Sequence, residues 1–437
     1  MIRISGPAAI AVADQIFSPL GKAAAKLSTA DSHTIHYGRV TRRGRYVDEV
    51  MASVMRAPRT FTREDVVEIT CHGGLLPARL VLEAALENGA RSALPGEFTK
   101  RAFLNGRIDL AQAEAVADLI QSRTELSLMA ANEQLAGKLS QRINTLRDEL
   151  VKTLAHVEAH IDFPDEDIAP DTRGQLVSRL EKGVAFMDEL LRTADEGRIL
   201  RRGIRAAIVG RPNAGKSSLL NQLLGQERAI VSAIPGTTRD TIEETANVRG
   251  LPVVFVDTAG LREAGDEIEA EGIRRSRESL ARAELILQVL DGSAALTPVD
   301  EQQLEEFAAK KRILVRNKSD LPARLILPAG LNVRVVEICC LTGKGIEELK
   351  DAIKEMVWAG EISSEMLQVM INARHQEALG RARTAAERAR AALASDQTLE
   401  LVAADLRTAM NAVGEIVGKT TTEDLLDSIF SQFCIGK

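Results

Sequence analysis

The chain has 437 residues, which allows about two to four domains, and its 45% apolar and 27% charged residues are an ordinary globular balance. The formal net charge of −6 excludes a surface that is basic as a whole, so any contact with a nucleic acid must be local, transient or supplied by a partner. The four cysteines form no zinc-spaced pair of pairs and no apolar stretch is long enough to cross a bilayer, so we expect a cytoplasmic protein without a membrane segment.

Residues 1–100 mix short apolar runs with Gly and Pro turns, which predicts a small α+β domain. The clearest of these runs are Ile2–Ile4, Tyr46–Met55 and Val66–Thr70. Residues 107–200 are predicted to be helical, because apolar side chains recur every three or four positions over 135–161 and again over 176–191. Pro164 separates the two helical stripes.

A glycine-rich segment follows the helices. Residues 210–217 read Gly-Arg-Pro-Asn-Ala-Gly-Lys-Ser and match G-x-x-x-x-G-K-[ST], a loop whose backbone N–H groups wrap a phosphate chain. The setting supports this interpretation, because Ile204–Val209 is typical of a buried strand and Ser217–Leu224 of a helix opening. We expect Lys216 to reach the terminal phosphates and the Ser217 hydroxyl to ligate Mg²⁺.

Two later motifs predict how the site recognises the base and holds the metal ion. The Asp320 carboxylate of Asn317–Asp320 can accept two hydrogen bonds from the guanine edge, whereas adenine would leave it buried and unpaired. Asp257 follows the predicted strand Val253–Val256 and can hold Mg²⁺ through water, and the Gly260 N–H can sense the γ-phosphate. The remaining predicted strands are Leu285–Leu290, Ile313–Val315 and Val333–Ile338. Motifs in this order, each at a strand end, predict a GTPase domain.

Residues 364–419 are again helical and Ala-rich, and a short last helix is predicted over Glu423–Phe433. The helical blocks on either side of the GTPase region each carry one apolar face, so we expect them to pack together as one bundle. The predicted fold is therefore a multidomain mix of α+β and α/β. Its parts are an N-terminal α+β domain (1–100), a discontinuous helical-bundle domain (101–202 and 358–437) and an inserted Ras-like P-loop GTPase domain (203–357).

Two groups of segments carry a resemblance to a known family. Within the GTPase region they are Gly210–Ser218, Gly236–Asp240, Asp257–Gly260 and Asn317–Asp320. Outside it they are the more distinctive runs Arg56–Pro58, Phe61–Val66, Pro95–Gly106 and the terminal Cys-Ile-Gly-Lys. Over essentially its whole length the sequence resembles the MnmE (TrmE) family of tRNA-modification GTPases. The family usually has a further stretch before the strand at Ile2, so we expect that stretch to be missing here.

The resemblance implies a K⁺-activated GTPase that, with a flavin-dependent partner (MnmG/GidA), modifies C5 of the wobble uridine of certain tRNAs. The added group is aminomethyl or carboxymethylaminomethyl, and its one-carbon unit comes from a 5-formyl- or 5,10-methylene-tetrahydrofolate. The N-terminal domain would then bind the tetrahydrofolate and mediate dimerisation. The expected assembly is a homodimer that forms a heterotetramer with the partner, and hydrolysis would open and close its GTPase domains.

The site residues form two sets. By position, the resemblance makes Arg3, Glu68, Arg107 and Lys437 the folate contacts, although an ordinary surface ion pair is the alternative for Arg3 and Glu68. The residues expected to bind GTP or GDP are Asn213, Ala214, Gly215, Lys216, Ser217, Ser218, Ser232, Thr237, Thr238, Asp257, Thr258, Ala259, Gly260, Asn317, Lys318 and Asp320.

Hydrolysis needs an oriented water. Leu261 stands where Ras-like enzymes carry the Gln that positions this water, so the function must come from elsewhere. By resemblance the candidate is Glu269, and the alternative is that Glu269 is one of several acids on a solvated loop. The resemblance also implies that K⁺ binds at Asn213, Ser232, Ile234 and Thr237 and that Mg²⁺ binds at Ser217 and Thr238.

The cysteines raise further alternatives. Cys434 is a second catalytic candidate, as a nucleophile toward C6 of uridine, and the alternative is that the tail only organises the folate pocket. Cys339-Cys340 replaces the family's usual Ser-Ala in the last guanine loop, and we expect small buried side chains there in preference to a redox switch. Cys71 and His72 are adjacent, so in an extended chain they would point apart.

Two other functions compete with tRNA modification. A ribosome-assembly GTPase of the Era/Der type shares Gly-Thr-Thr-Arg-Asp (236–240) and the loop Asn213. Such proteins usually carry a second GTPase domain or a basic KH domain, and neither is recognisable here. A switch that binds GTP without hydrolysing it is the third possibility, and turnover in K⁺ but not in Na⁺ would discard it.

Overall fold

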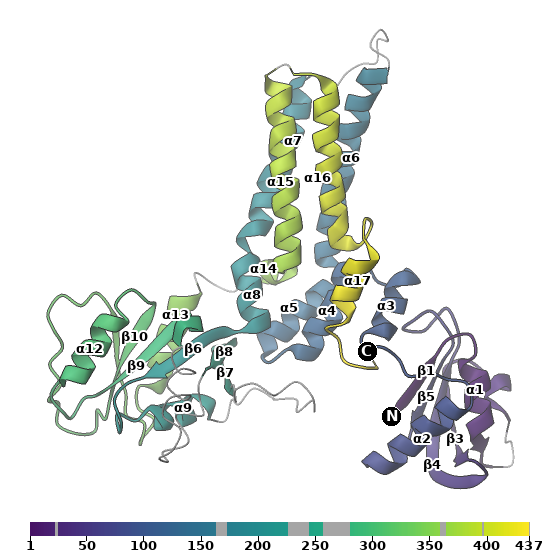
Figure 1. Ribbon diagram of the computed structural model, residues 1–437, viewed down its shortest axis with the longest axis horizontal. Helices are drawn as coiled ribbons and strands as arrows, with labels where there is room; N and C mark the ends of the chain where they lie inside the picture. Colours follow the sequence, from purple (N-terminus) through teal and green to yellow (C-terminus); the bar gives the residue numbers. More distant parts are fainter. Residues whose placement is uncertain are drawn as a thin grey trace. The chain divides into compact units, whose positions relative to one another are not determined.

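The computed structural model describes residues 1–21, 25–162, 173–225, 244–256, 280–358, 364–395 and 397–436 (Figure 1). It contains two compact units. One unit comprises Met1–Ala117, Ser140–Val151 and Met410–Lys437, and the other comprises Asp118–Leu139 and Lys152–Ala409. Each unit is described separately below.

The first unit contains a five-stranded antiparallel sheet in the order β1-β5-β4-β3-β2. The strands are β1 (Ile2–Ser5), β2 (Phe17–Pro19), β3 (Thr34–Arg42), β4 (Arg45–Met55) and β5 (Val66–Thr70), with helices α1 (Ala9–Ile16) and α2 (Leu75–Glu87) and a 3₁₀ turn η1 (Leu27–Thr29). Alternate residues of β4, including Val50, Ala52 and Val54, are buried in one core with α1 and α2. The residues between them, such as Met51, therefore lie on the opposite face of the sheet.

The C-terminal residues complete this unit. Helices α3 (Glu97–Leu104), α4 (Leu110–Gln121) and α17 (Glu423–Phe430) share a cluster in which Phe430 and Phe433 pack with Leu110 and Ala113. Thr422 caps α17, since its side chain accepts a hydrogen bond from Leu425 N. The predicted final helix over Glu423–Phe433 therefore exists and ends three residues earlier, at Phe430.

The second unit contains a six-stranded sheet in the order β11-β10-β9-β6-β8-β7, with only β7 antiparallel to its neighbour. The strands are β6 (Ile204–Val209), β7 (Glu244–Val248), β8 (Leu251–Phe255), β9 (Leu285–Asp291), β10 (Arg312–Asn317) and β11 (Arg334–Glu337). The helices are α9 (Lys216–Leu224), α12 (Pro298–Glu306) and α13 (Ile346–Val357). β6 lies between β8 and β9, where the order of the strands reverses, and such a switch point is where α/β sheets bind ligands.

The same unit contains most of the helical part of the chain. Its helices are α5 (Glu125–Leu135), α7 (Arg173–Arg192), α8 (Ala194–Arg202), α14 (Ser364–Gln368) and α15 (Ala373–Ala394), together with parts of α6 (Lys138–Asp162) and α16 (Leu399–Val417). The apolar stripe that begins at Leu135 is split between α5 and α6, because Gly137 adopts a left-handed φ of 83°.

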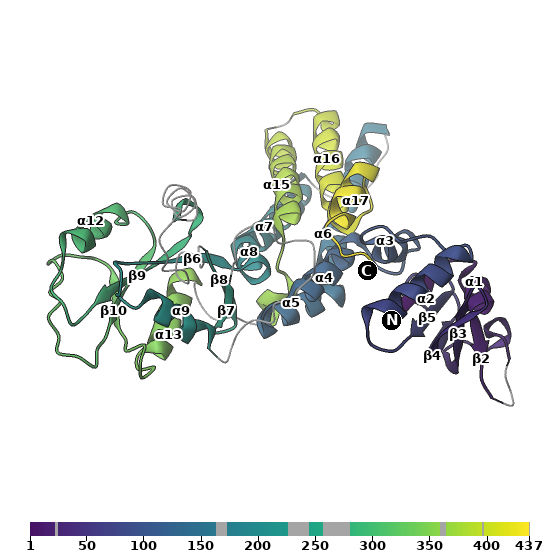
Figure 2. The same ribbon diagram turned by 60° about the horizontal axis from the view of Figure 1, so that its bottom comes forward.

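α7 and α15 lie side by side in Figure 1 and in Figure 2. Between the two helices, Arg383 of α15 pairs with Asp188 of α7 at 2.6 Å, and Arg390 lies 3.5 Å from Glu181 of α7. Among the residues that the structure describes, no helix is both long and apolar enough to span a membrane.

Candidate functional site

The predicted phosphate loop connects the end of β6 to the start of α9. Gly210 and Gly215 have φ values of 146° and 100°, and Asn213 adopts a φ of 62°. A Cβ on Gly210 would lie 2.3 Å from Val289 O, and one on Gly215 would lie 2.1 Å from Asn317 Nδ2. The glycines are therefore required both by their backbone angles and by the close approach of neighbouring strands.

Asn317 joins the guanine motif to the phosphate loop. Its Nδ2 donates to Ala214 O at 2.9 Å, and its Oδ1 accepts from Cys340 N at 3.1 Å. The Asn317 side chain is buried, with 3% of the residue exposed, so its two polar atoms depend on these bonds. One amide thus connects the phosphate loop, the end of β10 and the loop after β11.

Asp320, which is expected to recognise guanine, has a hydrogen-bond partner that the sequence motifs do not indicate. Cys339 Sγ donates to Asp320 Oδ1 at 3.1 Å, and Cys339 is buried. The bond orients the carboxylate while the other oxygen keeps its acceptor capacity. Burial, assisted by the neighbouring Cys339, raises the pKa of the Cys340 thiol to about 11, so Cys340 is a neutral packing side chain at neutral pH.

Lys318 extends from the same loop, with a φ of 65°, to Asp291 at the end of β9. Their ion pair measures 2.7 Å from Nζ to Oδ2. Burial acts to raise the pKa of Asp291, but hydrogen bonds from Lys318 and Ser293 outweigh it and hold that pKa below its usual value. The aliphatic stem of Lys318 is thereby fixed at the edge of the site.

These loops line a cavity of about 480 Å³. Its walls are Asn213, Gly215, Lys216, Ser217, Ser218, Asn317, Lys318, Asp320, Leu321, Cys339, Cys340 and Leu341. Lys216 Nζ donates to Arg211 O at 3.0 Å, and burial lowers the pKa of Lys216. A phosphate beside this ammonium would favour its charged form. The residues present therefore fit a nucleotide whose phosphates lie at the start of α9.

The structure thus brings together the described members of the predicted nucleotide site. The remaining predicted site residues lie outside the described residues: Ser232, Ile234, Thr237, Thr238, Asp257, Thr258, Ala259, Gly260, Glu269 and Lys437. Their roles stay predictions. Among the described residues, no group of three or more His, Cys, Asp and Glu side chains could hold a metal ion.

A second group of candidates lies in the first unit. Arg3 and Glu68 face each other across β1 and β5, and Arg3 Nε donates to Glu68 Oε1 at 2.6 Å. The Arg3 guanidinium also lies 5.7 Å from the ring centre of Phe98 on α3. The pair is therefore only partly solvated, with 27% and 23% of the two side chains exposed.

The run Pro95–Gly106 and the C-terminal Cys-Ile-Gly-Lys tail meet at the start of α3. Pro95 forms an antiparallel bridge with Ile435, and Gly96 N donates to Cys434 O at 3.3 Å. Gly96 has a φ of 65°, and a Cβ there would lie 2.6 Å from Phe430 O. The half-exposed Cys434 is thus placed beside α3, on which Phe98 contacts Arg3.

Arg107, the third folate candidate, follows the other end of α3 and contacts a different loop. Its guanidinium lies 4.9 Å from the ring centre of Phe61 and donates to Phe61 O at 3.2 Å. No bond joins it to Arg3 or Glu68 in the described structure. His72 pairs with Asp48 at 2.8 Å, which leaves no Cys–His pair with Cys71 among the described contacts.

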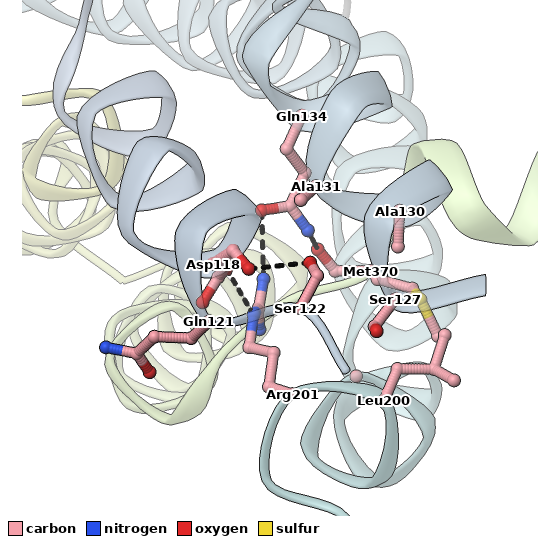
Figure 3. Close-up of a pocket in the computed structure, with 11 residues that line it drawn as sticks. Asp118, Gln121, Ser122, Ser127, Ala130, Ala131, Gln134, Leu200, Arg201 and Met370 are labelled. Atoms are coloured by element: carbon pink, nitrogen blue, oxygen red, sulfur yellow. Dashed lines mark hydrogen bonds and ion pairs between the residues drawn. The ribbon is translucent and has the colours of Figure 1, made fainter. Parts of the chain in front are cut away.

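A partly buried polar network lies beside α8, and Figure 3 shows its residues and bonds. Arg201 of α8, just before β6, donates to Asp118 at 2.6 Å and to Gln134 Oε1 at 2.9 Å. Gln134 Nε2 donates to Met370 O at 2.9 Å, just after α14. The cavity between them, about 20 Å³, would hold about one water, which Arg201 Nη1 could bond because it has no partner among the described atoms. No motif in the sequence marks this network.

The switch-point phosphate loop and the adjoining Asn-Lys-Ser-Asp loop define a P-loop protein of the GTPase class. The family model for the GTP-binding protein TrmE N-terminus matches residues 1–107, and the model for the MnmE helical domain matches residues 110–434. The chain belongs to the MnmE family of GTPases, so the resemblance and the fold class inferred from the sequence are confirmed.

Two individual relatives agree with this assignment. The chain is 47% identical to the tRNA modification GTPase MnmE of Bacillus velezensis and 48% identical to that of Geobacillus kaustophilus; each alignment covers 100% of this chain and 96% of the relative. Among solved structures, that of Era from Aquifex aeolicus bound to GDP and aluminium fluoride is 28% identical. It covers 41% of this chain and 66% of that chain, with a TM-score of 0.27.

Proposed function

We propose that this chain is a K⁺-activated GTPase that takes part in modifying C5 of the wobble uridine of tRNA. The observation that carries the GTPase part is the double hydrogen bond of Asn317, which connects the guanine loop to the phosphate loop. The tRNA part rests on the family and on the name of its curated members, tRNA modification GTPase.

In the nucleotide cavity, each described residue has a distinct task. Asp320 accepts hydrogen bonds from the guanine edge, and Cys339 orients it. Lys216 neutralises charge on the β- and γ-phosphates, and the helix N-terminus at α9 adds its dipole. Ser217 would hold Mg²⁺ together with Thr238, which lies outside the described residues, and the ion would supply further charge neutralisation. Glu269, also outside the described residues, would orient the attacking water.

K⁺ dependence is proposed from Asn213. This residue lines the cavity, is exposed, and has a left-handed φ of 62° that Asn adopts more readily than most side chains. An amide oxygen there, with Ser232, Ile234 and Thr237, is a suitable ligand set for a hard monovalent cation. Faster turnover in K⁺ than in Na⁺, lost in Asn213→Ala, is the expected behaviour.

Tetrahydrofolate binding is proposed in the first unit. Arg3 and Glu68 are held beside α3, and Lys437 follows in sequence the tail that runs along Pro95 and Gly96. There Arg3 and Lys437 would bind the carboxylates of the folate, and Glu68 would accept from its pterin N–H groups. Tetrahydrofolate would supply the one-carbon unit, and Cys434 stands on the tail as the candidate nucleophile.

Two assembly proposals follow. A homodimer is supported by the sheet face opposite α1 and α2, where Ile35, Tyr37 and Met51 are 68%, 54% and 50% exposed on adjacent strands. The flavin-dependent partner of the MnmG/GidA type and a cytoplasmic location come from the family resemblance.

The competing ribosome-assembly function gains no support from the described residues, because the segments outside the GTPase fold match MnmE and TrmE family models.

Mass spectrometry of wobble nucleosides tests the proposal. Cells lacking this gene should lose the C5-aminomethyl-type uridines, and the wild-type chain should restore them while Asp320→Ala should not. Unchanged uridines together with accumulated ribosome precursors would overturn the proposal and favour the assembly GTPase.

A further inference from the structure

The loop between β4 and β5 carries arginines that have no acidic partner. Arg59 and Arg63 are exposed, and neither lies within 4.0 Å of a carboxylate in the described structure. Arg63 Nη1 donates to the backbone carbonyl of Asn105 at 2.9 Å. Arg107, also exposed, donates to the carbonyl of Phe61 at 3.2 Å. A carbonyl carries no net charge, so these guanidinium charges are not neutralised.

The acids of the same loop are already engaged. Glu64 accepts from Arg101 at 3.0 Å and from Ser5 at 2.9 Å, and Asp65 accepts from Ala57 N at 2.9 Å. Neither carboxylate is therefore placed to neutralise Arg59 or Arg63. The loop has a net positive outer surface on a chain whose net charge is −6.

Some exposed arginines elsewhere in the described structure are paired with acids. On α15 and α16, Arg388 bonds Asp405 at 2.9 Å and Arg407 bonds Glu158 at 2.6 Å. Exposed arginines such as Arg45 and Arg334 also lack a carboxylate within 4.0 Å among the described residues. Arg63 and Arg107 differ from these because backbone carbonyls hold their guanidinium groups. A surface of uncompensated cations attracts a polyanion.

Two of the guanidinium groups are also held in place. The carbonyl bonds of Arg63 and Arg107 occupy only one or two of the five N–H donors of each arginine, and the others stay available. Arg107 is further fixed by its contact with the Phe61 ring at 4.9 Å. Prior ordering reduces the entropy lost when these side chains bind a phosphate, and the planar fork matches the phosphate oxygens.

We propose that Arg59, Arg63 and Arg107, here called the arginine surface, form a docking site for the phosphate backbone of tRNA. For Arg107 this role replaces the folate contact that the resemblance implies, because Arg107 contacts Phe61 and is not bonded to Arg3 or Glu68 in the described structure. The proposal rests on the proposed function, which makes tRNA the substrate. The arginines stand on exposed chain and not in the nucleotide cavity, so they suit an extended polyanion. Aromatic residues are only 3% of the sequence, which favours contacts to the backbone over stacking on bases.

The test is tRNA binding by the full-length chain at several salt concentrations. Arg59→Gln, Arg63→Gln and the double variant remove charge from exposed side chains outside the nucleotide cavity. Each arginine–phosphate ion pair that a variant removes should reduce the slope of log affinity against log salt by about 0.7 to 0.9. We expect the double variant to bind tRNA about tenfold more weakly than the wild-type chain at low salt, and Arg63→Lys to retain most of the slope.

Matched controls make the outcomes distinct. Arg388→Gln removes an exposed but paired arginine and should leave tRNA affinity unchanged, and equal melting temperatures check that each variant is folded. Unchanged affinity and slope in the double variant would overturn the arginine surface while leaving the tRNA function intact. Weaker folate binding with normal tRNA binding would reassign it to the folate. No tRNA binding by the wild-type chain, even with its flavin partner, would instead overturn the proposed function.

Discussion

Asn317 and Ala214 are joined by a hydrogen bond of 2.9 Å between the Asn317 amide and the Ala214 carbonyl. The two residues are far apart in the chain, one in the guanine loop and the other in the phosphate loop. The bond and the absent side chain of Gly215 depend on each other, because a Cβ on Gly215 would lie 2.1 Å from Asn317 Nδ2. Base recognition and phosphate binding are therefore built on shared contacts.

Removing this connection should weaken nucleotide binding. Asn317→Ala leaves two buried backbone groups, Ala214 O and Cys340 N, without their partners, at a cost of about 1–3 kcal/mol each. We expect GTP affinity to fall by about a hundredfold in isothermal titration calorimetry. Asn317→Asp is the matched control, because it can still accept from Cys340 N, and it should lose less. Equal losses of GTP affinity in the two variants would show that the bond from Cys340 N contributes nothing to binding.

Cys339 should act as a positioning residue for Asp320. Cys339→Ala removes the thiol donor and is expected to raise KM for GTP several-fold with little change in kcat, because the bond acts on base binding and not on the phosphates. Cys339→Ser restores a donor at the same position and should recover the KM. A KM unchanged in Cys339→Ala would show that Asp320 needs no help from this thiol.

The first unit should lose stability in acid through Glu97. Hydrogen bonds from Arg91, the Leu94 N–H and Arg101 outweigh burial and lower the pKa of Glu97 from its usual 4.5 to about 2. A depressed folded-state pKa adds stability above about pH 4.5, and that stability is lost as the pH falls toward 2. We expect Glu97→Gln to lower the free energy of unfolding by about 2 kcal/mol at pH 7, with the difference vanishing near pH 2. Parallel pH profiles of the two proteins would contradict this.

The Arg201 network should stabilise the region where the GTPase fold joins the helices. Arg201→Met leaves the Asp118 carboxylate without this cation, at a cost of about 2–3 kcal/mol. Trp358, the one tryptophan of the sequence, is buried in a cluster with Ile199 and Leu200 next to Arg201 and reports on this region by fluorescence. The urea midpoint of Trp358 emission should fall, and adding Asp118→Asn should recover part of it. An unchanged urea midpoint in Arg201→Met would show that the network does not stabilise this region.

The strands with continuous apolar runs could be read from the sequence. β6 has the predicted bounds, and β9 and β10 contain the predicted runs, because buried parallel strands need apolar side chains on both faces. β3 and β7 could not be read in this way. β3 alternates polar and apolar residues because one of its faces is exposed, and β7 contains the polar Glu244, Thr245 and Asn247.

The members of the nucleotide site could also be predicted, since each motif stands at a strand end. Their mutual contacts could not. Nothing in the chain order shows that the Cys339 thiol meets Asp320, or that the tail residue Ile435 bridges Pro95, because these contacts depend on how distant segments pack. The same holds for Arg201 and Gln134, whose pairing needs the packing of α5 on α8.

The most direct test of the central claim is nucleotide specificity at Asp320. Xanthine carries an oxygen where guanine carries its exocyclic amine, so replacing the Asp320 carboxylate by an amide supplies a donor to that oxygen. We predict that the wild-type chain binds GTP far more tightly than XTP in calorimetry and that Asp320→Asn reverses this order by about a hundredfold or more. Equal affinity of the wild-type chain for GTP and XTP, or no change in preference in Asp320→Asn, would contradict the assignment of this cavity to a guanine nucleotide.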